Sequence, residues 1–151
     1  MKLFISHSPE QTREIARHCL TVISFEKSAD EATVVGLSGH LGSGKTAFAQ
    51  AVAAELGVVE QVTSPTFVIM KLYDPKIGPW KKLVHIDAYR LEEGRELAVL
   101  GFEDIVADEG NLILIEWMEK VKEILPNNTR LIEFEAVGEN DRSIHMSDMH
   151  K

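Results

Sequence analysis

The order of apolar and polar positions along the chain predicts strands and helices that alternate. Short runs of aliphatic and β-branched residues, typical of buried strands, occupy residues 32–38, 67–73, 82–87 and 111–116. Two later segments, 130–136 and 142–146, alternate apolar with polar residues as half-buried strands do. Pro75, Gly78 and Pro79 separate two of the runs, so residues 67–87 are predicted to form a hairpin.

Two longer helices are predicted, and each has a recognisable start or end. Ser8 fits an N-cap, with Pro9 at the first helical position and Gln11 at the capping-box distance, and apolar residues at helical spacing follow. Residues 46–56 are rich in alanine and contain neither proline nor glycine, and Gly57 is placed to end this helix. Shorter helices are predicted over residues 92–100, 102–107 and 119–125.

These elements predict an α/β fold in which helices flank a sheet of mixed parallel and antiparallel strands. The chain has 151 residues, no internal repeat and no long linker, so one domain is expected over residues 1–151. A hydrophobic fraction of 44% and a charged fraction of 26% are ordinary for a soluble globular protein.

The sequence gives no sign of a membrane location. No apolar run approaches the roughly 20 residues of a membrane span, and the N-terminus lacks the apolar core of a secretion signal. The single cysteine, Cys19, has no partner for an internal disulfide. We therefore expect a cytoplasmic protein.

The strongest chemical signal lies between the strand predicted over 32–38 and the helix predicted over 46–56. The connecting residues fit the phosphate-binding loop pattern G-x-x-x-x-G-K-[ST]: Gly39, His40, Leu41, Gly42, Ser43, Gly44, Lys45 and Thr46. Such a loop points backbone N–H groups at a polyphosphate, while Lys45 can reach the β- and γ-phosphates and the Thr46 hydroxyl can ligate Mg²⁺. The sequence therefore predicts a nucleoside triphosphate site on a three-layer, P-loop NTPase-like fold.

Two of the predicted strands end in an acidic residue. Asp87 closes the run 82–87, and Glu116 closes the run 111–116. Because functional groups of open α/β sheets gather at the carboxyl ends of strands, both acids are predicted beside the phosphate loop as catalytic or metal-binding residues. Glu116 follows the more hydrophobic run, whereas Asp87 is shorter and better suited to act through a water. Which acid lies nearer Mg²⁺ therefore stays open.

The loop that follows the phosphate-loop helix holds a third candidate. Pro65 keeps Ser64 out of helical geometry, and the hydroxyls of Ser64 and Thr66 flank the proline. In GTPases a threonine on an analogous loop senses the γ-phosphate, so Thr66 is a candidate switch residue, and a rigid turn is the alternative. Trp117, directly after Glu116, is predicted either to close the site or to fill the core.

The net charge bears on the kind of partner. A formal charge of −8 argues against a protein that holds nucleic acid by general electrostatics. The local exception is residues 71–90, which contain Lys71, Lys76, Lys81, Lys82 and Arg90 against Asp74 and Asp87. This segment is either a docking patch for an acidic partner or a solvated loop edge.

Five segments together carry a family resemblance. In chain order they are GHLGSGKT, VTSPTF, HIDAYRL, LGFEDI and LILIEW. Their order and spacing resemble the bacterial TsaE (YjeE-like) P-loop ATPases, which are needed to form threonylcarbamoyladenosine beside the tRNA anticodon. The resemblance extends from the first predicted helix to Arg142, which is nearly the whole chain.

The resemblance implies a set of ligands and partners. It implies ATP on residues 39–46, Mg²⁺ held by Thr46 and Glu116 with Asp87 close by, a switch-like loop at 64–66, and Trp117 near the site. It implies two protein partners, the tRNA threonylcarbamoyl-transferase and the non-catalytic paralogue of that subunit. ATP hydrolysis would reset their complex, and tRNA would be reached only through it.

The resemblance also places residues outside the loop and shows two departures. Pro9, Thr12 and Arg142 match positions where the family closes over the nucleotide. His40 and Ser43 stand where the family usually has Asp and Ala. Neither position must supply a side chain to the phosphates, so nucleotide binding is expected to survive. His40 exchanges a negative group for one that titrates near neutral pH.

Three other classes of protein use the same loop. A small-molecule or nucleotide kinase is the main alternative, but the six arginines form no cluster and no insertion is long enough for a lid. A GTPase is disfavoured because the chain contains no N-K-x-D or D-x-x-G segment. A binding module that does not hydrolyse its nucleotide stays open, since Asp87 and Glu116 would serve binding as well as turnover.

Overall fold

The computed structural model describes residues 2–149, and over them strands and helices alternate as the sequence predicts, with one additional strand at the start. The elements are β1 (Lys2–Ser6), α1 (Pro9–Phe25), β2 (Thr33–Ser38), α2 (Lys45–Glu55), β3 (Met70–Tyr73), β4 (Lys82–Asp87), α3 (Gly94–Ala98), α4 (Phe102–Val106), β5 (Asn111–Glu116), β6 (Arg130–Ala136) and β7 (Arg142–Asp148). Two 3₁₀ turns, Met118–Lys120 and Lys122–Ile124, follow β5.

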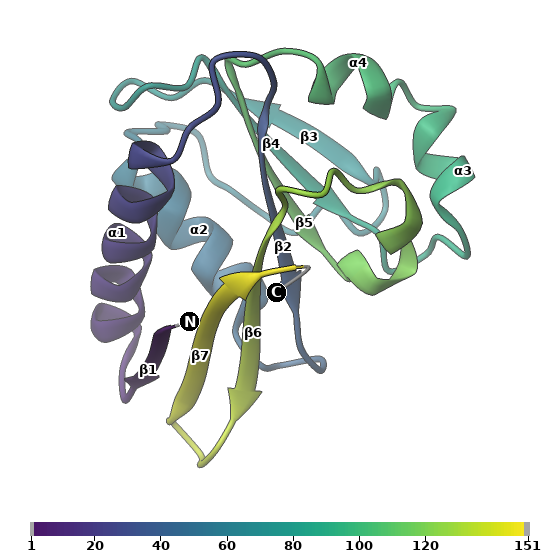
Figure 1. Cartoon of the computed structure of the whole chain (residues 1–151). Helices are drawn as coiled ribbons and strands as arrows, with labels where there is room; N and C mark the ends of the chain where they lie inside the picture. Colours follow the sequence, from purple (N-terminus) through teal and green to yellow (C-terminus); the bar gives the residue numbers. More distant parts are fainter. Residues whose placement is uncertain (1, 150–151) are drawn as a thin grey trace.

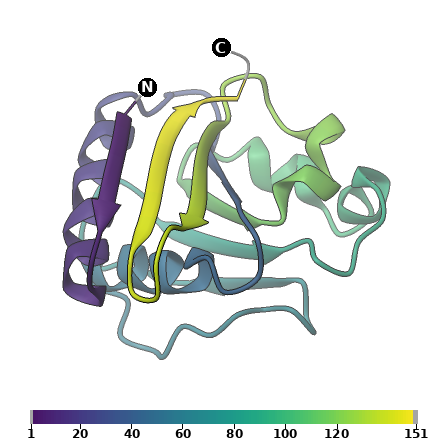
Figure 2. The same ribbon diagram turned by 90° about the horizontal axis from the view of Figure 1, so that it is seen from below.

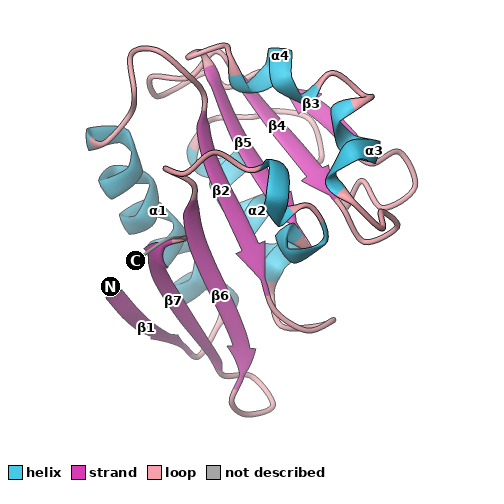
Figure 3. Cartoon of the chain, turned by 45° about the vertical axis from the view of Figure 1, so that its right-hand side comes forward, coloured by secondary structure: helices cyan, strands magenta, loops and turns pink. Residues whose placement is uncertain are grey.

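Seven strands of the described region form one sheet in the order β1-β7-β6-β2-β5-β4-β3 (Figure 1 and Figure 3). The four central strands, β6, β2, β5 and β4, are parallel, whereas β1, β7 and β3 pair antiparallel with their neighbours. The predicted mixed sheet and the predicted hairpin of β3 and β4 are both confirmed. As a result, β2, which leads into the phosphate loop, lies at the centre of the sheet.

Helices cover both faces of this sheet and give it the predicted three layers. Successive side chains of a strand point to opposite faces. Val35 and Leu37 of β2 therefore join a core under α1 and α2, and Val34 joins a second core with α3, α4 and the 3₁₀ turns. Figure 2 shows α1 running alongside β1 at one side of the molecule. Across residues 2–149, every helix falls short of the length and apolar character that a membrane span requires.

The start of α1 is capped much as the sequence predicts. The Ser8 hydroxyl accepts a hydrogen bond from the backbone N–H of Gln11 at 3.1 Å, and Pro9 is the first helical residue. The Gln11 amide oxygen accepts from the backbone N–H of His7 at 2.6 Å, one residue before the N-cap. The cap therefore connects the end of β1 to the first turn of α1 by hydrogen bonds.

Three of the predicted elements differ from those observed. β3 begins at Met70, because residues 66–69 turn back on Pro65, whose carbonyl accepts from the N–H of Ile69 at 2.6 Å. Ile69 has φ 68°, a left-handed conformation that β-branched residues rarely adopt. The helix predicted over 92–100 is limited to α3, which a capping box of Glu93 and Glu96 starts. The helix predicted over 119–125 is two 3₁₀ turns.

The approach of a 3₁₀ turn to β2 leads to a prediction about stability. A Cβ atom added at Gly36 would lie 2.9 Å from Cγ of Met118. We expect Gly36→Ala to lower the free energy of unfolding by about 1–3 kcal/mol, as overpacking of a core does. Urea unfolding measures this change. Combining Gly36→Ala with Met118→Ala should cost less than the sum of the single changes. An unchanged midpoint for Gly36→Ala would contradict the packing described here.

Candidate functional site

The phosphate loop connects the end of β2 to the start of α2. Gly39, at the beginning of the loop, lies where a Cβ atom would be 2.6 Å from both the Phe134 carbonyl oxygen and the Ser43 hydroxyl. Only glycine fits there without displacing the backbone of β6. Leu41 at the tip is 88% exposed, and the Ser43 hydroxyl is buried with no hydrogen-bond partner among residues 2–149. The loop therefore has a close-packed base and an exposed tip.

Lys45 is the first residue of α2 and is buried beneath the loop. Its ammonium donates to the carbonyl oxygen of His40 at 3.0 Å and to that of Gly39, and it lies 4.4 Å from the centre of the Trp117 ring. Burial lowers the pKa of Lys45, against the opposing effect of nearby acids, Glu116 first. A desolvated cation that donates to two carbonyl oxygens of the loop is suited to receive an anion there.

The two strand-end acids lie side by side. Asp87 of β4 and Glu116 of β5 are register partners on adjacent parallel strands, and each residue is 3% exposed. Glu116 Oε1 accepts a hydrogen bond from the Thr46 hydroxyl at 2.9 Å. Because Thr46 is the hydroxyl residue of the phosphate loop, this contact places Glu116 beside the predicted metal position.

Asp87 has different partners. Its Oδ2 accepts from the Thr66 hydroxyl at 2.7 Å and from the Ser64 hydroxyl at 3.0 Å, and its Oδ1 accepts from the backbone N–H of Tyr89 at 2.9 Å. Asp87 thus connects the loop at 64–66 to the end of β4. The sequence left the roles of the two acids open, and the structure distinguishes their contacts.

This donor set suits Mg²⁺ that arrives with a nucleotide. Hydroxyl and carboxylate oxygens are the ligands that Mg²⁺ prefers, and one or two carboxylates commonly share the ion with substrate phosphates. Within residues 2–149, no three His, Cys, Asp or Glu side chains gather in a way that could hold a metal by themselves. The residues therefore fit a metal held jointly with phosphate.

Trp117 packs partly against the core and also lines the cavity that contains the phosphate loop. It has φ 60°, and its indole packs partly against the core under α3 and α4. The same ring faces Lys45 and lies 5.2 Å from the ring of Tyr89, centre to centre. The left-handed backbone directly after Glu116 turns this indole back toward the phosphate loop.

Two of the cavities that adjoin the loop contain predicted site residues from distant parts of the chain. One of about 540 Å³ contains the phosphate-loop side chains and the acids, and its lining includes Leu41, Lys45, Thr46, Ser64, Thr66, Asp87, Glu116, Trp117 and Arg142. A second, of about 560 Å³, is lined by Pro9 and Thr12 of α1, by Ser43 and Gly44, and by Arg142 of β7. Arg142 and Gly44 line both. The structure thus brings Pro9, Thr12 and Arg142 to the phosphate loop, although they are distant from it in sequence.

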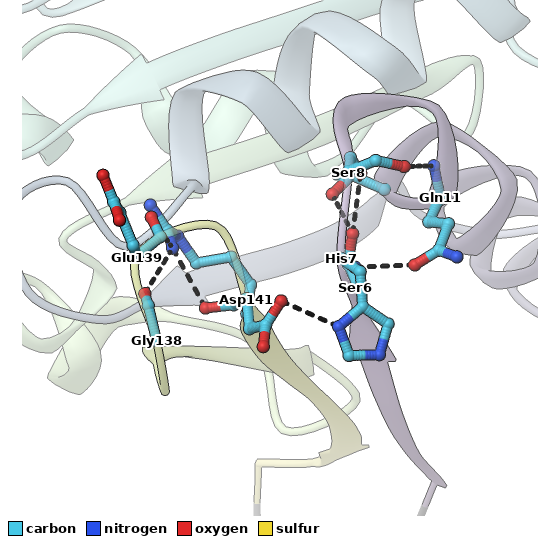
Figure 4. A network of polar contacts seen from close by, with 9 residues as sticks. Ser6, His7, Ser8, Gln11, Gly138, Glu139 and Asp141 are labelled. Atoms are coloured by element: carbon cyan, nitrogen blue, oxygen red, sulfur yellow. Dashed lines mark hydrogen bonds and ion pairs between the residues drawn. The ribbon is translucent and has the colours of Figure 1, made fainter.

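One of the polar contacts drawn in Figure 4 joins the two sides of the second cavity. The His7 ring nitrogen Nδ1 lies 2.7 Å from the Asp141 carboxylate, which connects the start of α1 to the turn between β6 and β7. The Thr12 hydroxyl lies 2.7 Å from that of Ser6, and the Arg142 guanidinium donates to the Asp141 carbonyl at 3.0 Å. His40 lies outside this cavity, in a neighbouring one with Trp117 and Glu119.

Two residues beside the acids, His85 and Tyr89, were not predicted as site residues from the sequence. His85 contacts Glu116 from within the sheet, and the backbone N–H of Tyr89 donates to Asp87 while its ring lies 5.2 Å from that of Trp117. His85 precedes Asp87 by two residues, so strand periodicity could have placed both on one face.

Comparison with known proteins places this geometry in a family. A family model described as Threonylcarbamoyl adenosine biosynthesis protein TsaE matches residues 6–144. The tRNA threonylcarbamoyladenosine biosynthesis protein TsaE of Bacillus subtilis is 37% identical over 137 residues, which cover 91% of this chain and 79% of that protein. The protein of the same name from Streptomyces coelicolor is 43% identical over 108 residues, covering 70% and 71%.

A solved structure confirms the fold class. The crystal structure of Bacillus subtilis YdiB matches with a TM-score of 0.74 and 31% sequence identity, covering 97% of this chain and 84% of that one. The similarity therefore includes both helical layers as well as the sheet.

Proposed function

The chain belongs to the TsaE family of threonylcarbamoyl adenosine biosynthesis proteins, and from this premise we propose that it is a Mg²⁺-dependent ATPase acting in tRNA threonylcarbamoyladenosine formation. Its partners in this proposal are the tRNA threonylcarbamoyl-transferase and that enzyme's non-catalytic paralogue, in the cytoplasm. ATP hydrolysis resets their complex, and the group transfer takes place on the partner. A formal charge of −8 suits a protein that reaches tRNA only through such a complex.

One observation carries the ATPase proposal: a continuous set of contacts from the phosphate loop to the two acids. The Thr46 hydroxyl meets Glu116, Glu116 pairs in register with Asp87, and Asp87 holds Thr66. These are the parts that phosphoryl transfer needs: a phosphate cradle, a metal ligand, a second acid and a residue that responds to the γ-phosphate.

The chain's own residues have distinct tasks in this proposal. The loop N–H groups bind the phosphates, and the Lys45 ammonium exchanges its carbonyl partners for phosphate oxygens. Thr46 and Glu116 hold Mg²⁺, which when bound neutralises charge on the phosphates. Asp87 orients the attacking water. Pro9, Thr12 and Arg142 enclose the nucleoside in the second cavity, and Trp117 excludes water above Lys45.

Thr66 is proposed as the residue that distinguishes ATP from ADP. We expect Thr66→Ala to leave ADP affinity unchanged but to reduce the difference in partner affinity between the ATP and ADP states. The loop would lose the shorter of its two hydrogen bonds to Asp87, which is 2.7 Å from Thr66 and 3.0 Å from Ser64. Binding of the chain to surface-immobilised partner protein, measured once with ATP and once with ADP, gives this difference. Ser64→Ala is the matched control, and it should retain most of the discrimination. Full discrimination in the Thr66 variant would remove the switch role.

The proposed function is tested by Mg²⁺-dependent ATP hydrolysis, first by the chain alone and then with the transferase pair added. Slow turnover that rises with the pair is the expected result. Phosphate passed to a small acceptor, with no response to the pair, would instead identify the kinase alternative. Nucleotide binding without turnover under any condition would identify a binding module.

A further inference from the structure

A buried histidine contacts the acid next to Thr46. The His85 ring nitrogen Nε2 lies 2.6 Å from Glu116 Oε2, and the two side chains are 1% and 3% exposed. The other ring nitrogen, Nδ1, is buried without a hydrogen-bond partner among residues 2–149. The function proposed above gives His85 no task.

These surroundings determine how the contact is made. An ionised carboxylate only accepts hydrogen bonds, so against the Glu116 carboxylate Nε2 carries the proton and donates a hydrogen bond. With the proton on Nε2, Nδ1 leaves only an unused lone pair. His85 therefore serves as a hydrogen-bond donor to a single oxygen.

The contact divides the two oxygens of Glu116 between two partners. Oε2 receives the His85 bond from within the sheet, and Oε1 receives the Thr46 bond from the phosphate loop. A free glutamate side chain has several rotamers, and the observed one makes both bonds at once. The His85 bond consequently selects the rotamer in which Oε1 faces the loop.

Packing alone does not account for a histidine at this position. Its neighbours on the same face of the sheet, Leu83 two residues earlier on β4 and Leu114 opposite on β5, are apolar and buried. An apolar side chain would fill the same place without burying an unpaired nitrogen. Only a polar side chain can supply the hydrogen bond to Glu116.

We propose that His85 is a positioning residue that orients the Glu116 carboxylate for Mg²⁺ bound with nucleotide. This inference rests on the proposed function and adds to it a buried residue that touches neither nucleotide nor metal. Outer partners of metal ligands are generally worth about 10–100-fold in metal affinity or activity, so His85 should affect the metal and not the nucleotide as such.

The test compares three substitutions of His85. Gln places an amide N–H where Nε2 lies, Asn places it where Nδ1 lies, and Leu removes the donor while keeping an apolar side chain. Affinity for a fluorescent ADP analogue is measured in Mg²⁺ and in EDTA. We expect His85→Leu and His85→Asn to lose about tenfold or more of the affinity gained with Mg²⁺, while affinity in EDTA stays at the wild-type value. His85→Gln should restore most of the gain.

The outcomes separate this inference from the function on which it rests. A wild-type Mg²⁺ gain in His85→Leu, or equal losses in Mg²⁺ and EDTA, would overturn the positioning role and leave the proposed function intact. No Mg²⁺ gain in the wild-type protein would overturn both. If the variants do not fold, nitrogen-15 NMR of the wild-type histidines decides: a proton on Nε2 of His85 supports the inference, and a proton on Nδ1 alone contradicts it.

Discussion

Replacing Lys45 by alanine is expected to weaken ATP binding by about ten- to a hundredfold, the largest effect on affinity of any single change at this site. The Lys45 ammonium is the buried cation at the phosphate loop, and charge-assisted bonds to phosphate oxygens are stronger than neutral ones. Isothermal titration with ATP measures the loss. The stabilisation that ATP gives the folded protein should fall with it, because that stabilisation depends on ligand concentration relative to Kd.

The free protein should respond in the opposite direction. Burial lowers the pKa of Lys45, which means that the folded state holds this charge less favourably than water does. We therefore expect Lys45→Ala to keep or raise the melting temperature without nucleotide while it removes the rise caused by ATP. Lys76→Ala, an exposed lysine outside both cavities, is the matched control. Unchanged ATP affinity in the Lys45 variant would reject the phosphate-loop assignment.

The central part of the fold could be predicted from the sequence because local pattern and burial agree there. The strands β4 and β5 have the predicted bounds, since continuous aliphatic runs can be buried only at the centre of a sheet covered on both faces. The phosphate loop was equally clear, because its glycines and Lys45 belong to one motif and stand next to each other in sequence. In such places no distant partner is needed to interpret the residues.

The edges could not be predicted in this way. β1 is mostly exposed and pairs only with β7, which lies at the other end of the chain, so its formation depends on a partner that local pattern does not show. The apolar residues 67–69 look like the start of a strand, but the backbone bonds to Pro65 turn them away from the sheet. A distant partner strand determines the first segment and a local turn on Pro65 determines the second, and the apolar pattern shows neither.

The sequence indicates which candidate residues stand at the ends of the central strands, but not which side chains they contact. Asp87 and Glu116 could be identified because each closes a buried strand. Their division of contacts, with Glu116 on Thr46 and Asp87 on Thr66, depends on strand register and side-chain rotamers. His85 was not predicted as a site residue because a single buried histidine between apolar residues resembles a core residue. Its 2.6 Å contact with Glu116 is what connects it to the site.

Because Glu116 and Asp87 have different contacts, substitutions of the two acids should impair ATP turnover in different ways. Glu116→Gln should lower Mg²⁺-dependent ATP turnover by about 10–100-fold and raise the Mg²⁺ concentration needed, because the carboxylate beside Thr46 loses its charge. Asp87→Asn should lower turnover while the Mg²⁺ requirement stays near the wild-type value, because Asp87 contacts the loop at 64–66 and not Thr46. Steady-state rates over a Mg²⁺ titration separate the two defects.

A matched control distinguishes metal binding from a general loss of negative charge. The negative charge of Glu119, like that of Glu116, raises the pKa of Lys45. Glu119, however, lies exposed on a 3₁₀ turn and makes no contact with Thr46. Glu119→Gln should therefore keep wild-type turnover. Metal-free nucleotide affinity should be unchanged or higher in Glu116→Gln, because a negative charge near the phosphates is removed. If Glu116→Gln hydrolyses ATP at the wild-type rate, this carboxylate only supports the fold, and the metal must be held by Asp87 instead.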